Sequence, residues 1–344
     1  MKVFTSKKNS LFYIAEIGSA HEGSFSNAIK ILTEACNSNA DCVKIQIYKA
    51  EKLVSKKYDL KRFLHFKKME LKIRQYFTLA KICKKYKKLF CASIWDKDLI
   101  FKFKNHVDIF KIGSGDLTNY EIIEKIIKTN KPLIISVGLS NFNEIKETLR
   151  FIRSKNNKYL KNKVALLHCN TAYPTPLNDV NLQQIILIKK KFKLITGYSD
   201  HTIGDSAIIY AKAMGAEIIE KHFSNDVLKT TFRDHQISLD RVGVNNFLEK
   251  INLLYNAKKS KLTSSEINQN NEKSFRRSIY AYKNIKIGEK FTKKNLICLR
   301  PFISISANNI FNLYNKKSKK KYTKGDLIDV KELVNSNNIA NNVS

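Results

Sequence analysis

Short apolar segments of strand length recur along residues 12–222 and alternate with amphipathic segments of helical length. We predict strands at Phe12–Glu16, Cys42–Gln46, Leu89–Ser93, Asp108–Ile112, Pro132–Ser136, Val164–His168, Leu194–Tyr198 and Ile218–His222. The intervening helices are predicted at Ser26–Asn37, Glu121–Thr129, Asn143–Ser154, Leu182–Lys191 and Ser206–Met214. Strands that alternate with helices form a parallel sheet with right-handed crossovers, and eight such units favour an α/β (β/α)8 TIM barrel over an open sheet. The longer segment Lys52–Arg74 predicts an extra helix or loop over one face.

Nearly every predicted strand ends in a polar or ionisable residue. These residues are Glu16, Lys44 with Gln46, Ser93, Lys111 with Ser114, Ser136, His168, Ser199 to His201, and Glu220 with His222. The carboxyl ends of the strands in such a barrel meet on one face, where barrel enzymes carry their chemistry. Buried charges are costly unless they are paired or used. The pattern therefore predicts an active site on this face, with a structural polar layer across the barrel mouth as the alternative.

Two histidines end neighbouring predicted strands, His201 in the segment Tyr198-Ser-Asp-His-Thr and His222 in Glu220-Lys-His-Phe. Adjacent strands lie about 4.8 Å apart, so both imidazoles can reach one ion. Two histidines leave several coordination positions open, as a Lewis-acid site needs. The pair predicts a divalent metal site. Of the other histidines, His21, His168 and His235 are candidates for the barrel mouth, whereas His65 and His106 are interpreted as surface or core residues.

A second group of strand-end residues has the chemistry of an anion site. Its members are Lys44, Lys111, Ser114, Ser136 and Ser199. A phosphorylated carboxylate favours cations and hydroxyl groups that converge from different strands, together with backbone N–H groups. The turn Gly113-Ser-Gly115 suits close approach of the backbone to such an anion. The alternative for Lys111 is an ion pair with Asp108 or Asp116.

The charge of the chain admits two interpretations. With 63 Lys and Arg against 30 Asp and Glu, the net charge is +33. Because lysine is frequent everywhere and no nucleic-acid-binding motif is present, we favour compositional bias and steering of anionic substrates over a nucleic-acid partner. The six cysteines are scattered, which indicates a reducing compartment rather than a disulfide framework. No apolar run has the length of a membrane span and no signal peptide is evident, so we expect a cytoplasmic protein without a membrane partner.

Six motifs follow one another in an order and spacing that resemble the N-acetylneuraminate (sialic acid) synthase family, including the legionaminic acid synthases. They are Ala15-Glu-Ile-Gly-Ser-Ala-His-Glu-Gly23, Val43-Lys-Ile-Gln46, Lys111-Ile-Gly-Ser-Gly-Asp116, Leu167-His-Cys-Asn-Thr-Ala-Tyr-Pro-Thr-Pro176, Gly197-Tyr-Ser-Asp-His-Thr202 and Glu220-Lys-His-Phe223. The resemblance covers nearly the whole chain. It implies an enzyme that condenses phosphoenolpyruvate with the open-chain form of an N-acetylmannosamine-like sugar, with a divalent metal polarising the aldehyde.

The resemblance also implies roles for individual residues. The residues with implied catalytic roles are Glu16, Asp116 and Glu220, and the implied metal ligands are His201 and His222. Phosphoenolpyruvate is expected to contact Lys44, Gln46, Lys111, Ser114, Ser136, Thr171 and Ser199. The sugar is expected to contact Tyr173, Asp234 and Arg300. Glu220 is the candidate for handling water or its proton, and Glu16 is expected to orient the sugar. The metal is expected to be Mn2+, with Mg2+ and Co2+ as alternatives, since two imidazoles with oxygen ligands suit Mn2+.

The C-terminal part resembles the antifreeze-like (SAF) domain that follows the barrel in this family. Its motifs are Arg276-Arg-Ser-Ile-Tyr-Ala, Ile285-Lys-Ile-Gly-Glu-Lys-Phe-Thr292 and Leu299-Arg-Pro301. Short predicted strands and turns at Gly288 and Gly325 favour a small β-rich module. We predict a catalytic barrel at 1–262, a linker at 263–273, the SAF domain at 274–334 and a disordered tail at 335–344. The resemblance implies a domain-swapped homodimer in which Arg300 reaches the partner's barrel.

The sequence leaves the product open. N-acetylneuraminate, a legionaminate-type acid or another nonulosonate all fit, and a pseudaminate is less favoured because of the Gly113-Ser-Gly-Asp116 turn. Two other classes are weighed against a sialic acid synthase. A barrel that binds polyanions without catalysis is disfavoured because the expected metal and phosphate-site side chains are present. A phosphoenolpyruvate aldol enzyme that makes a heptulosonate is disfavoured because such enzymes lack this C-terminal module.

Overall fold

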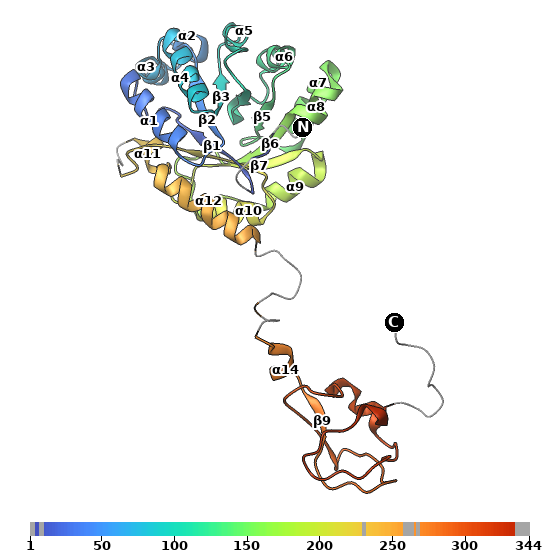
Figure 1. Cartoon of the computed structure of the whole chain (residues 1–344). Helices are drawn as coiled ribbons and strands as arrows, with labels where there is room; N and C mark the ends of the chain where they lie inside the picture. The colour runs from blue at the N-terminus through green and yellow to red at the C-terminus, as the bar shows by residue number, and fades with distance from the viewer. Residues whose placement is uncertain (1–3, 7–9, 229–231, 257–264, 266–268, 334–344) are drawn as a thin grey trace. The chain divides into compact units, whose positions relative to one another are not determined.

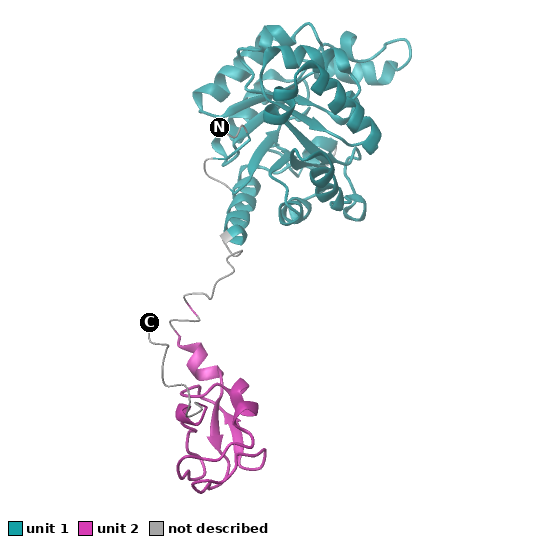
Figure 2. Ribbon diagram, turned by 90° about the vertical axis from the view of Figure 1, so that its right-hand side faces the viewer, with its two compact units in different colours: residues 1–258 teal, residues 259–344 magenta. Residues whose placement is uncertain are grey.

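The computed structural model describes residues 4–6, 10–228, 232–256, 265 and 269–333. The chain divides into two compact units, Met1–Lys258 and Lys259–Ser344, shown in separate colours in Figure 2. Each unit has its own apolar core. The predicted boundary after residue 262 lies four residues beyond this division, and the predicted tail at 335–344 lies outside the described residues.

The first unit is a closed parallel barrel of eight strands, which confirms the predicted TIM barrel (Figure 1). The strands are β1 (Phe12–Glu16), β2 (Cys42–Ile47), β3 (Leu89–Ile94), β4 (Ile109–Ile112), β5 (Leu133–Ser136), β6 (Val164–Cys169), β7 (Ile195–Asp200) and β8 (Ile218–His222). Each strand pairs with the next along the chain, and β8 closes the barrel by pairing in parallel with β1. The predicted strands agree with these bounds to within two residues at each end.

Helices pack around the barrel as an outer layer. The longer ones are α1 (Phe25–Asn37), α3 (Leu60–Met69), α4 (Ile73–Lys85), α6 (Tyr120–Thr129), α7 (Phe142–Lys155), α9 (Gln183–Phe192), α10 (Ser206–Ala213) and α12 (Arg241–Asn256). Shorter ones are α2 (Ala50–Leu53), α5 (Ile100–Phe103), α8 (Asn157–Lys163) and α11 (Arg233–Gln236). The five predicted helices are confirmed, and the predicted insertion at Lys52–Arg74 contains α3. The sequence interpretation missed α4, α5, α8, α11 and α12.

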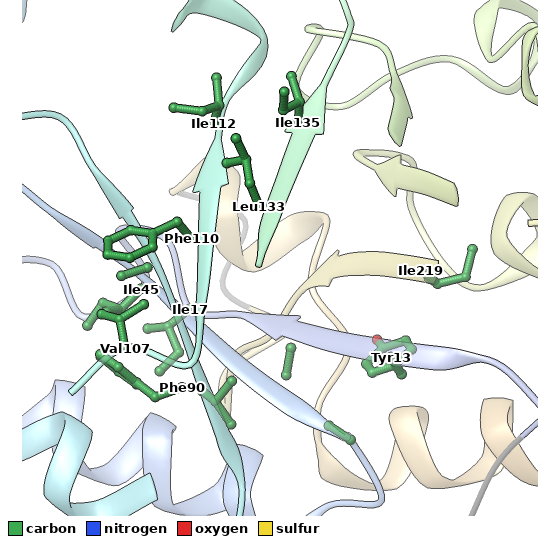
Figure 3. Packing of buried hydrophobic residues seen from close by; sticks show 14 of the residues in the cluster. Tyr13, Ile17, Ile45, Phe90, Val107, Phe110, Ile112, Leu133, Ile135 and Ile219 are labelled. Carbon is green, nitrogen blue, oxygen red and sulfur yellow. The ribbon is translucent and has the colours of Figure 1, made fainter. Parts of the chain in front are cut away.

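The period of two along each strand divides the barrel residues between two apolar layers. Outward side chains such as Tyr13, Phe110 and Ile135 pack against the helices (Figure 3). Inward side chains such as Ile14 and Ile134 form an apolar plug inside the barrel. Beyond this plug, the next inward positions toward the carboxyl ends are polar: Glu16, Lys44, Ser93, Lys111, Ser136, Ser199 and Glu220. The alternation thus places a layer of polar and charged side chains between the apolar plug and the carboxyl ends of the strands.

The second unit is small and only partly regular. Strands β9 (Ser278–Ala281) and β10 (Leu296–Leu299) pair antiparallel, and isolated bridges join Ile285 to Tyr322 and Lys290 to Lys317. Short helices α14 (Asn271–Phe275) and α15 (Ile310–Leu313) accompany them, so a helix begins inside the segment predicted as a linker. The predicted turns at Gly288 and Gly325 have φ of +81° and +96°, which glycine adopts without steric cost.

No helix in the described ranges is long and apolar enough to cross a membrane.

Candidate active site

A pocket of about 470 Å³ opens at the carboxyl ends of the barrel strands. Its lining includes most of the residues that the sequence predicts for the site: Lys44, Gln46, Lys111, Ser114, Asp116, Ser136, Thr171, Tyr173, Ser199, His201, Glu220 and His222. These residues come from loops and strands spread along the chain, and the barrel brings them together. Of the residues predicted to have catalytic, substrate-binding or metal-binding roles, Glu16, Asp234 and Arg300 are absent from this lining.

Glu220 on β8 lies between two buried lysines. Its Oε1 is 3.6 Å from the Nζ of Lys44 and 3.6 Å from that of Lys111, and it accepts a 2.9 Å hydrogen bond from the Ser199 hydroxyl. Burial by itself raises the pKa of Glu220, but Lys111 and Lys44 outweigh it and lower that pKa to about 2. Glu220 is therefore a carboxylate at neutral pH. No hydrogen-bond partner within the described residues reaches its Oε2.

Lys111 donates a 2.6 Å hydrogen bond to the hydroxyl of Ser136 on the neighbouring strand. It forms no ion pair with Asp108 or Asp116 in the described structure, so the alternative role that the sequence left open for Lys111 is wrong. Asp108 instead accepts a hydrogen bond from the backbone N–H of Phe90. Lys111 thus lines the pocket, with its ammonium group 3.6 Å from the carboxylate of Glu220.

Lys44 forms an ion pair with Glu16, and both side chains are almost fully buried. Burial lowers the pKa of Lys44. The Glu16 carboxylate also accepts hydrogen bonds from the backbone N–H of Gly18 at 2.7 Å and from the Gln46 amide at 3.3 Å. Its contacts are therefore with the protein, and Glu16 orients Lys44 and Gln46 in this structure.

The rings of His201 and His222 lie side by side, with centroids 5.5 Å apart. His201 donates a hydrogen bond from Nδ1 to the backbone oxygen of Asn170 at 2.6 Å, which leaves Nε2 as an unprotonated acceptor in the neutral ring. Burial lowers the pKa of His201 and lowers that of His222 to about 3. Both rings are therefore neutral, which is the protonation state that binds metals.

These two imidazoles fit a divalent metal. Nδ1 of buried His222 has no hydrogen-bond partner within the described part of the chain, although Asp234 Oδ2 lies 3.8 Å away. A buried nitrogen without a partner is costly unless a ligand satisfies it. The described residues contain no group of three or more His, Cys, Asp or Glu side chains with metal-binding geometry. The protein ligands would thus be His201 and His222, and substrate or water oxygens would complete the coordination.

Asp234 and Tyr173 surround this histidine pair. Asp234 on α11 is buried and accepts a 2.8 Å hydrogen bond from the backbone N–H of Ser19. The Tyr173 ring packs on His201 with centroids 4.0 Å apart, and the guanidinium of Arg233 lies 4.7 Å from the centre of the same ring. Gly18 has φ of +55°, and a Cβ there would meet Asp234 Oδ2 at 2.7 Å. Glycine at this position therefore allows the backbone of the turn after β1 to pack closely against Asp234 and His222.

The pocket lining also includes Asp116, Ser114 and Thr171. Ser114 and Asp116 belong to a 3-10 turn at Ser114–Asp116 that follows β4 directly. Burial raises the pKa of Asp116, while its hydrogen bond from Asn119 opposes this effect. A Cβ on Gly138 would lie 2.8 Å from the Ser114 hydroxyl and 3.0 Å from that of Thr171. A glycine at 138 thus permits these two hydroxyl groups to approach one another.

The structure corrects the interpretation of two other histidines. His168 faces outward from β6, donates a 2.7 Å hydrogen bond to the backbone oxygen of Val180 and stacks on Tyr198. His235 is buried and forms hydrogen bonds with Ser224 and Glu22. Neither ring lines the pocket, and the buried ring of His21, the third candidate for the mouth, does not line it either. Both were placed at the mouth on chain position alone. His168 lies on the outward side of β6, and His235 lies on α11, where its ring bonds Ser224 and Glu22.

The pocket also contains residues that the sequence interpretation missed. Arg62 and Phe66 come from α3, Trp95 follows β3, and Arg233 comes from α11. Cys169 at the end of β6 also lines the pocket. The signal for Arg62 and Phe66 was the predicted insertion over one face, although nothing in the pattern indicated which of its side chains turn inward.

Arg300 belongs to the second unit. Its guanidinium lies 5.1 Å from the ring centre of Phe275, and its side chain is exposed. Its expected contact with a partner's barrel stays a prediction.

A closed barrel whose catalytic face holds buried lysines, a carboxylate and two neutral histidines defines the class of protein: an enzyme built on a TIM barrel. Comparison with known proteins identifies its kind. The chain belongs to the NeuB family, whose family pattern matches residues 31–263.

Individual relatives agree with this assignment. The chain is 35% identical to the N,N'-diacetyllegionaminic acid synthase of Campylobacter jejuni, over 92% of this chain and 98% of that protein. It is 34% identical to the uncharacterized protein MJ1065 of Methanocaldococcus jannaschii, over 94% of this chain and 95% of that protein. The solved N-acetylneuraminic acid (sialic acid) synthetase from Leptospira borgpetersenii superposes with a TM-score of 0.67 at 28% identity, covering 78% of this chain and 94% of that one. The protein is therefore an enzyme of the sialic acid synthase type, a nonulosonic acid synthase.

Proposed function

We propose that this enzyme condenses phosphoenolpyruvate with the open-chain aldehyde of an N-acylated hexosamine and releases a nonulosonic acid and phosphate. The observation that carries the proposal is the buried arrangement of Lys44, Glu220 and Lys111 next to the His201 and His222 pair. Two cations and several hydroxyl groups above an apolar plug suit a small, multiply charged anion. Two neutral imidazoles beside them suit a divalent cation that an aldehyde oxygen can reach.

The phosphoenolpyruvate end of the pocket is assigned to the two lysines and the surrounding hydroxyl groups. Lys44 and Lys111 come from different strands, and Ser136 and Ser199 supply donors from two more. Gly113 and Gly115 have no atom within 4 Å of the position that a Cβ would occupy, so their backbone is open to the pocket. Charge-assisted hydrogen bonds from several directions would hold both the carboxylate and the phosphate of one ligand.

The metal would be Mn2+, held by His201 and His222, and when bound it supplies Lewis-acid polarisation of the aldehyde. Asp234 and Tyr173 lie against these rings and are placed to orient the sugar. Arg62, Phe66 and Arg233 also line the pocket and would contact the sugar.

The reaction forms a bond between C3 of phosphoenolpyruvate and the aldehyde carbon. Water then adds at C2, the C2–O bond to phosphate breaks, and phosphate leaves with its electron pair. Glu220 is ionised and lies between Lys44 and Lys111, so it is placed to accept the proton that the attacking water loses. Asp116, whose burial raises its pKa, lies at the side of the pocket near Ser114 and would stabilise positive charge that develops at C2.

We propose a 2,4-diacetamido hexose as the sugar, which would make the product a legionaminate-type acid. The relative from Campylobacter jejuni named N,N'-diacetyllegionaminic acid synthase supports this choice, since it matches 98% of its length. N-acetylmannosamine, giving N-acetylneuraminate, is the alternative. We further propose that the second unit is an SAF domain whose Arg300 contacts the sugar in the barrel of a partner subunit.

The test is a turnover assay on the purified full chain with Mn2+ and phosphoenolpyruvate. A panel of N-acyl hexosamines is offered, phosphate release is measured, and products are identified by mass. We expect phosphate release only when sugar is present, and fastest with the diacetamido hexose. Lys111→Met should abolish release, whereas Lys125→Met, at a partly exposed lysine of α6 that pairs with Asp98 outside the pocket, should leave it unchanged. Absence of phosphate release with every sugar would refute the proposed function.

A further inference from the structure

An ion pair that the proposed chemistry does not use lies on the outer side of the barrel. Asp200 on β7 and Lys221 on β8 are directly opposite one another in the strand register. Both side chains are 0% exposed, and Lys221 Nζ donates to Asp200 Oδ2 at 2.5 Å. Each residue precedes one of the two site histidines, His201 and His222, in the chain.

Thr202 closes this pair into a ring of hydrogen bonds. Lys221 Nζ also donates to the backbone oxygen of Thr202 at 2.7 Å. Asp200 accepts from the backbone N–H of Thr202 at 3.0 Å and from its hydroxyl at 3.1 Å. His201 stands between Asp200 and Thr202, so both of its neighbours in the chain are fixed to β8 by the same ammonium group.

The position of His201 explains why such a ring is useful. Strand β7 ends at Asp200, so His201 lies past the last residue that pairs with β8. Its backbone therefore lacks the strand ladder that positions His222, the last residue of β8. The ring formed by Asp200, Lys221 and Thr202 replaces that ladder by side-chain contacts.

Packing alone does not account for this ion pair. At the carboxyl ends of β1 to β5 the corresponding outward positions carry apolar side chains, namely Ile17, Ile47, Ile94, Ile112 and Val137. Ile17 and Ile112 are labelled in Figure 3. Well-packed apolar residues in place of a buried ion pair are usually neutral or stabilising. The ion pair at this position of β7 and β8 therefore calls for another explanation, and each of its residues adjoins one of the two site histidines in the chain.

We propose that Asp200, Lys221 and Thr202 are positioning residues that hold the imidazoles of His201 and His222 at the spacing a divalent cation requires. The inference rests on the metal site of the proposed function. Residues behind metal ligands influence affinity because they set the geometry of the ligands. Here the contact is made through the backbone on both sides of His201 and through the residue before His222.

The test compares Mn2+ affinity with stability in matched variants of the full chain. Mn2+ alone is titrated by calorimetry and by electron paramagnetic resonance of the free ion, and the thermal midpoint is recorded without metal. The paired variant Asp200→Asn with Lys221→Met keeps side-chain size and leaves no buried charge, so its thermal midpoint should stay near that of the unaltered chain. Its Mn2+ dissociation constant should rise about tenfold.

Two further variants separate positioning from stability. Thr202→Val removes one hydroxyl contact to the Asp200 carboxylate but keeps the backbone contact, and we expect Mn2+ to bind about threefold more weakly. Thr196→Val is the control, because Thr196 is a 0% exposed residue of β7 whose hydroxyl donates to the backbone oxygen of Leu194 at the other end of the barrel. Its Mn2+ affinity should not change.

Unchanged Mn2+ affinity in the paired variant and in Thr202→Val would overturn the positioning role, as would an equal loss in Thr196→Val. If the paired variant does not fold, Thr202→Val decides by itself. Failure of the unaltered chain to bind Mn2+ would instead refute the metal site of the proposed function and this inference with it, so the two failures are distinguishable.

Discussion

The residue on which the site depends most is Glu220, a single carboxylate in contact with both lysines of the pocket. The two lysines, Lys44 and Lys111, face the carboxylates Glu16 and Glu220 in the same buried region. The formal charges of these four side chains therefore cancel. An anionic ligand must compete with Glu220 for these lysines. Glu220 therefore affects both the affinity for such a ligand and the chemical step.

Replacing Glu220 by Gln should separate binding from turnover. Without the carboxylate charge, Lys111 has no carboxylate partner and Lys44 keeps only Glu16, so phosphoenolpyruvate should bind on the order of tenfold more tightly. The rate constant kcat should fall by about 10²–10⁴, the usual contribution of a positioned general base. Calorimetry with phosphoenolpyruvate and steady-state kinetics check the two parts.

Glu217→Gln is the matched control for this variant, because Glu217 is a surface carboxylate that pairs with Lys189. It should change neither quantity. Weaker binding of phosphoenolpyruvate to Glu220→Gln would contradict the placement of that ligand between Lys44 and Lys111.

His21 gives a prediction for acid stability. Burial lowers its pKa to about 4, against the opposing influence of Asp234, and its Nδ1 accepts a hydrogen bond from the backbone N–H of Gly23. The unfolded chain binds a proton at this residue below about pH 6.5, while the folded chain does not. The stabilising contribution is therefore complete above pH 6.5 and is lost as the pH falls toward 4.

His21→Asn keeps an acceptor for Gly23 and removes the titration. The difference between the two proteins in free energy of unfolding should change by at most about 1.4 kcal/mol per pH unit between pH 6.5 and 4. Denaturant unfolding at several pH values measures it. Parallel stability curves for the two proteins would show that His21 does not titrate as described.

At the scale of elements, the turns after the strands carry the site, and the strands determine where those turns lie. The inward positions change from apolar to polar toward the carboxyl end of every barrel strand except β6, which ends inward at Cys169, so the turns after the strands lie above a largely polar layer. Several turns depend on a residue with positive φ. Gly18 after β1 and Gly204 after β7 both adopt such a conformation, with φ of +55° and +78°.

The two glycines allow a matched comparison of strain and crowding. Gly18→Ala and Gly204→Ala should both lose about 1–2 kcal/mol of stability from the left-handed backbone. Only at Gly18 would the new Cβ overlap the site, 2.7 Å from Asp234 Oδ2 and 2.9 Å from His222 Cε1, whereas nothing lies within 4 Å of it at Gly204. Turnover should therefore fall about 10²-fold in Gly18→Ala alone, since displacements near 1 Å have such effects.

Chemical denaturation and steady-state kinetics on both variants provide the check. Equal turnover in the two would show that the turn after β1 does not shape the site.

At the scale of the whole molecule, the barrel holds the chemistry and the second unit has a separate core. That core packs Ile279, Phe291, Leu313, Tyr322 and Ile328 around the pair of strands β9 and β10. Arg300, the residue of this unit for which a role in the sugar site is proposed, is exposed. A domain-swapped dimer makes a specific prediction, because each active site would then combine residues of two chains.

Two inactive variants should complement one another when mixed. Lys111→Met removes a pocket cation, and Arg300→Ala removes the proposed sugar contact. In a mixed dimer the barrel with Lys111 intact receives the Arg300 of its partner, so one site of two is complete. After subunit exchange at equal amounts, about a quarter of the unaltered activity should return. Each variant incubated alone is the control, and no recovery in the mixture would mean that each chain completes its own site.

Much of the barrel and of its site was predictable from the sequence, because both depend on local periodicity. Apolar runs of strand length with a period of two specify where the strands begin and end, and the polar residue that ends each run specifies the catalytic face. The predicted lysines, serines and both metal histidines accordingly lie in one pocket. The same reasoning failed where a residue has the right chain position and the wrong side of the strand, as His168 does.

What only the tertiary structure decided are the contacts between residues far apart in the chain. The pairing of Glu16 with Lys44, the two contacts of Glu220 and the ring around His201 join different strands, and α3 and α11 bring Arg62 and Arg233 to the pocket. Such contacts depend on the shear and closure of the barrel, which set how neighbouring strands are offset. Local sequence determines the strand and its polar end, whereas the closed sheet determines which of those ends touch.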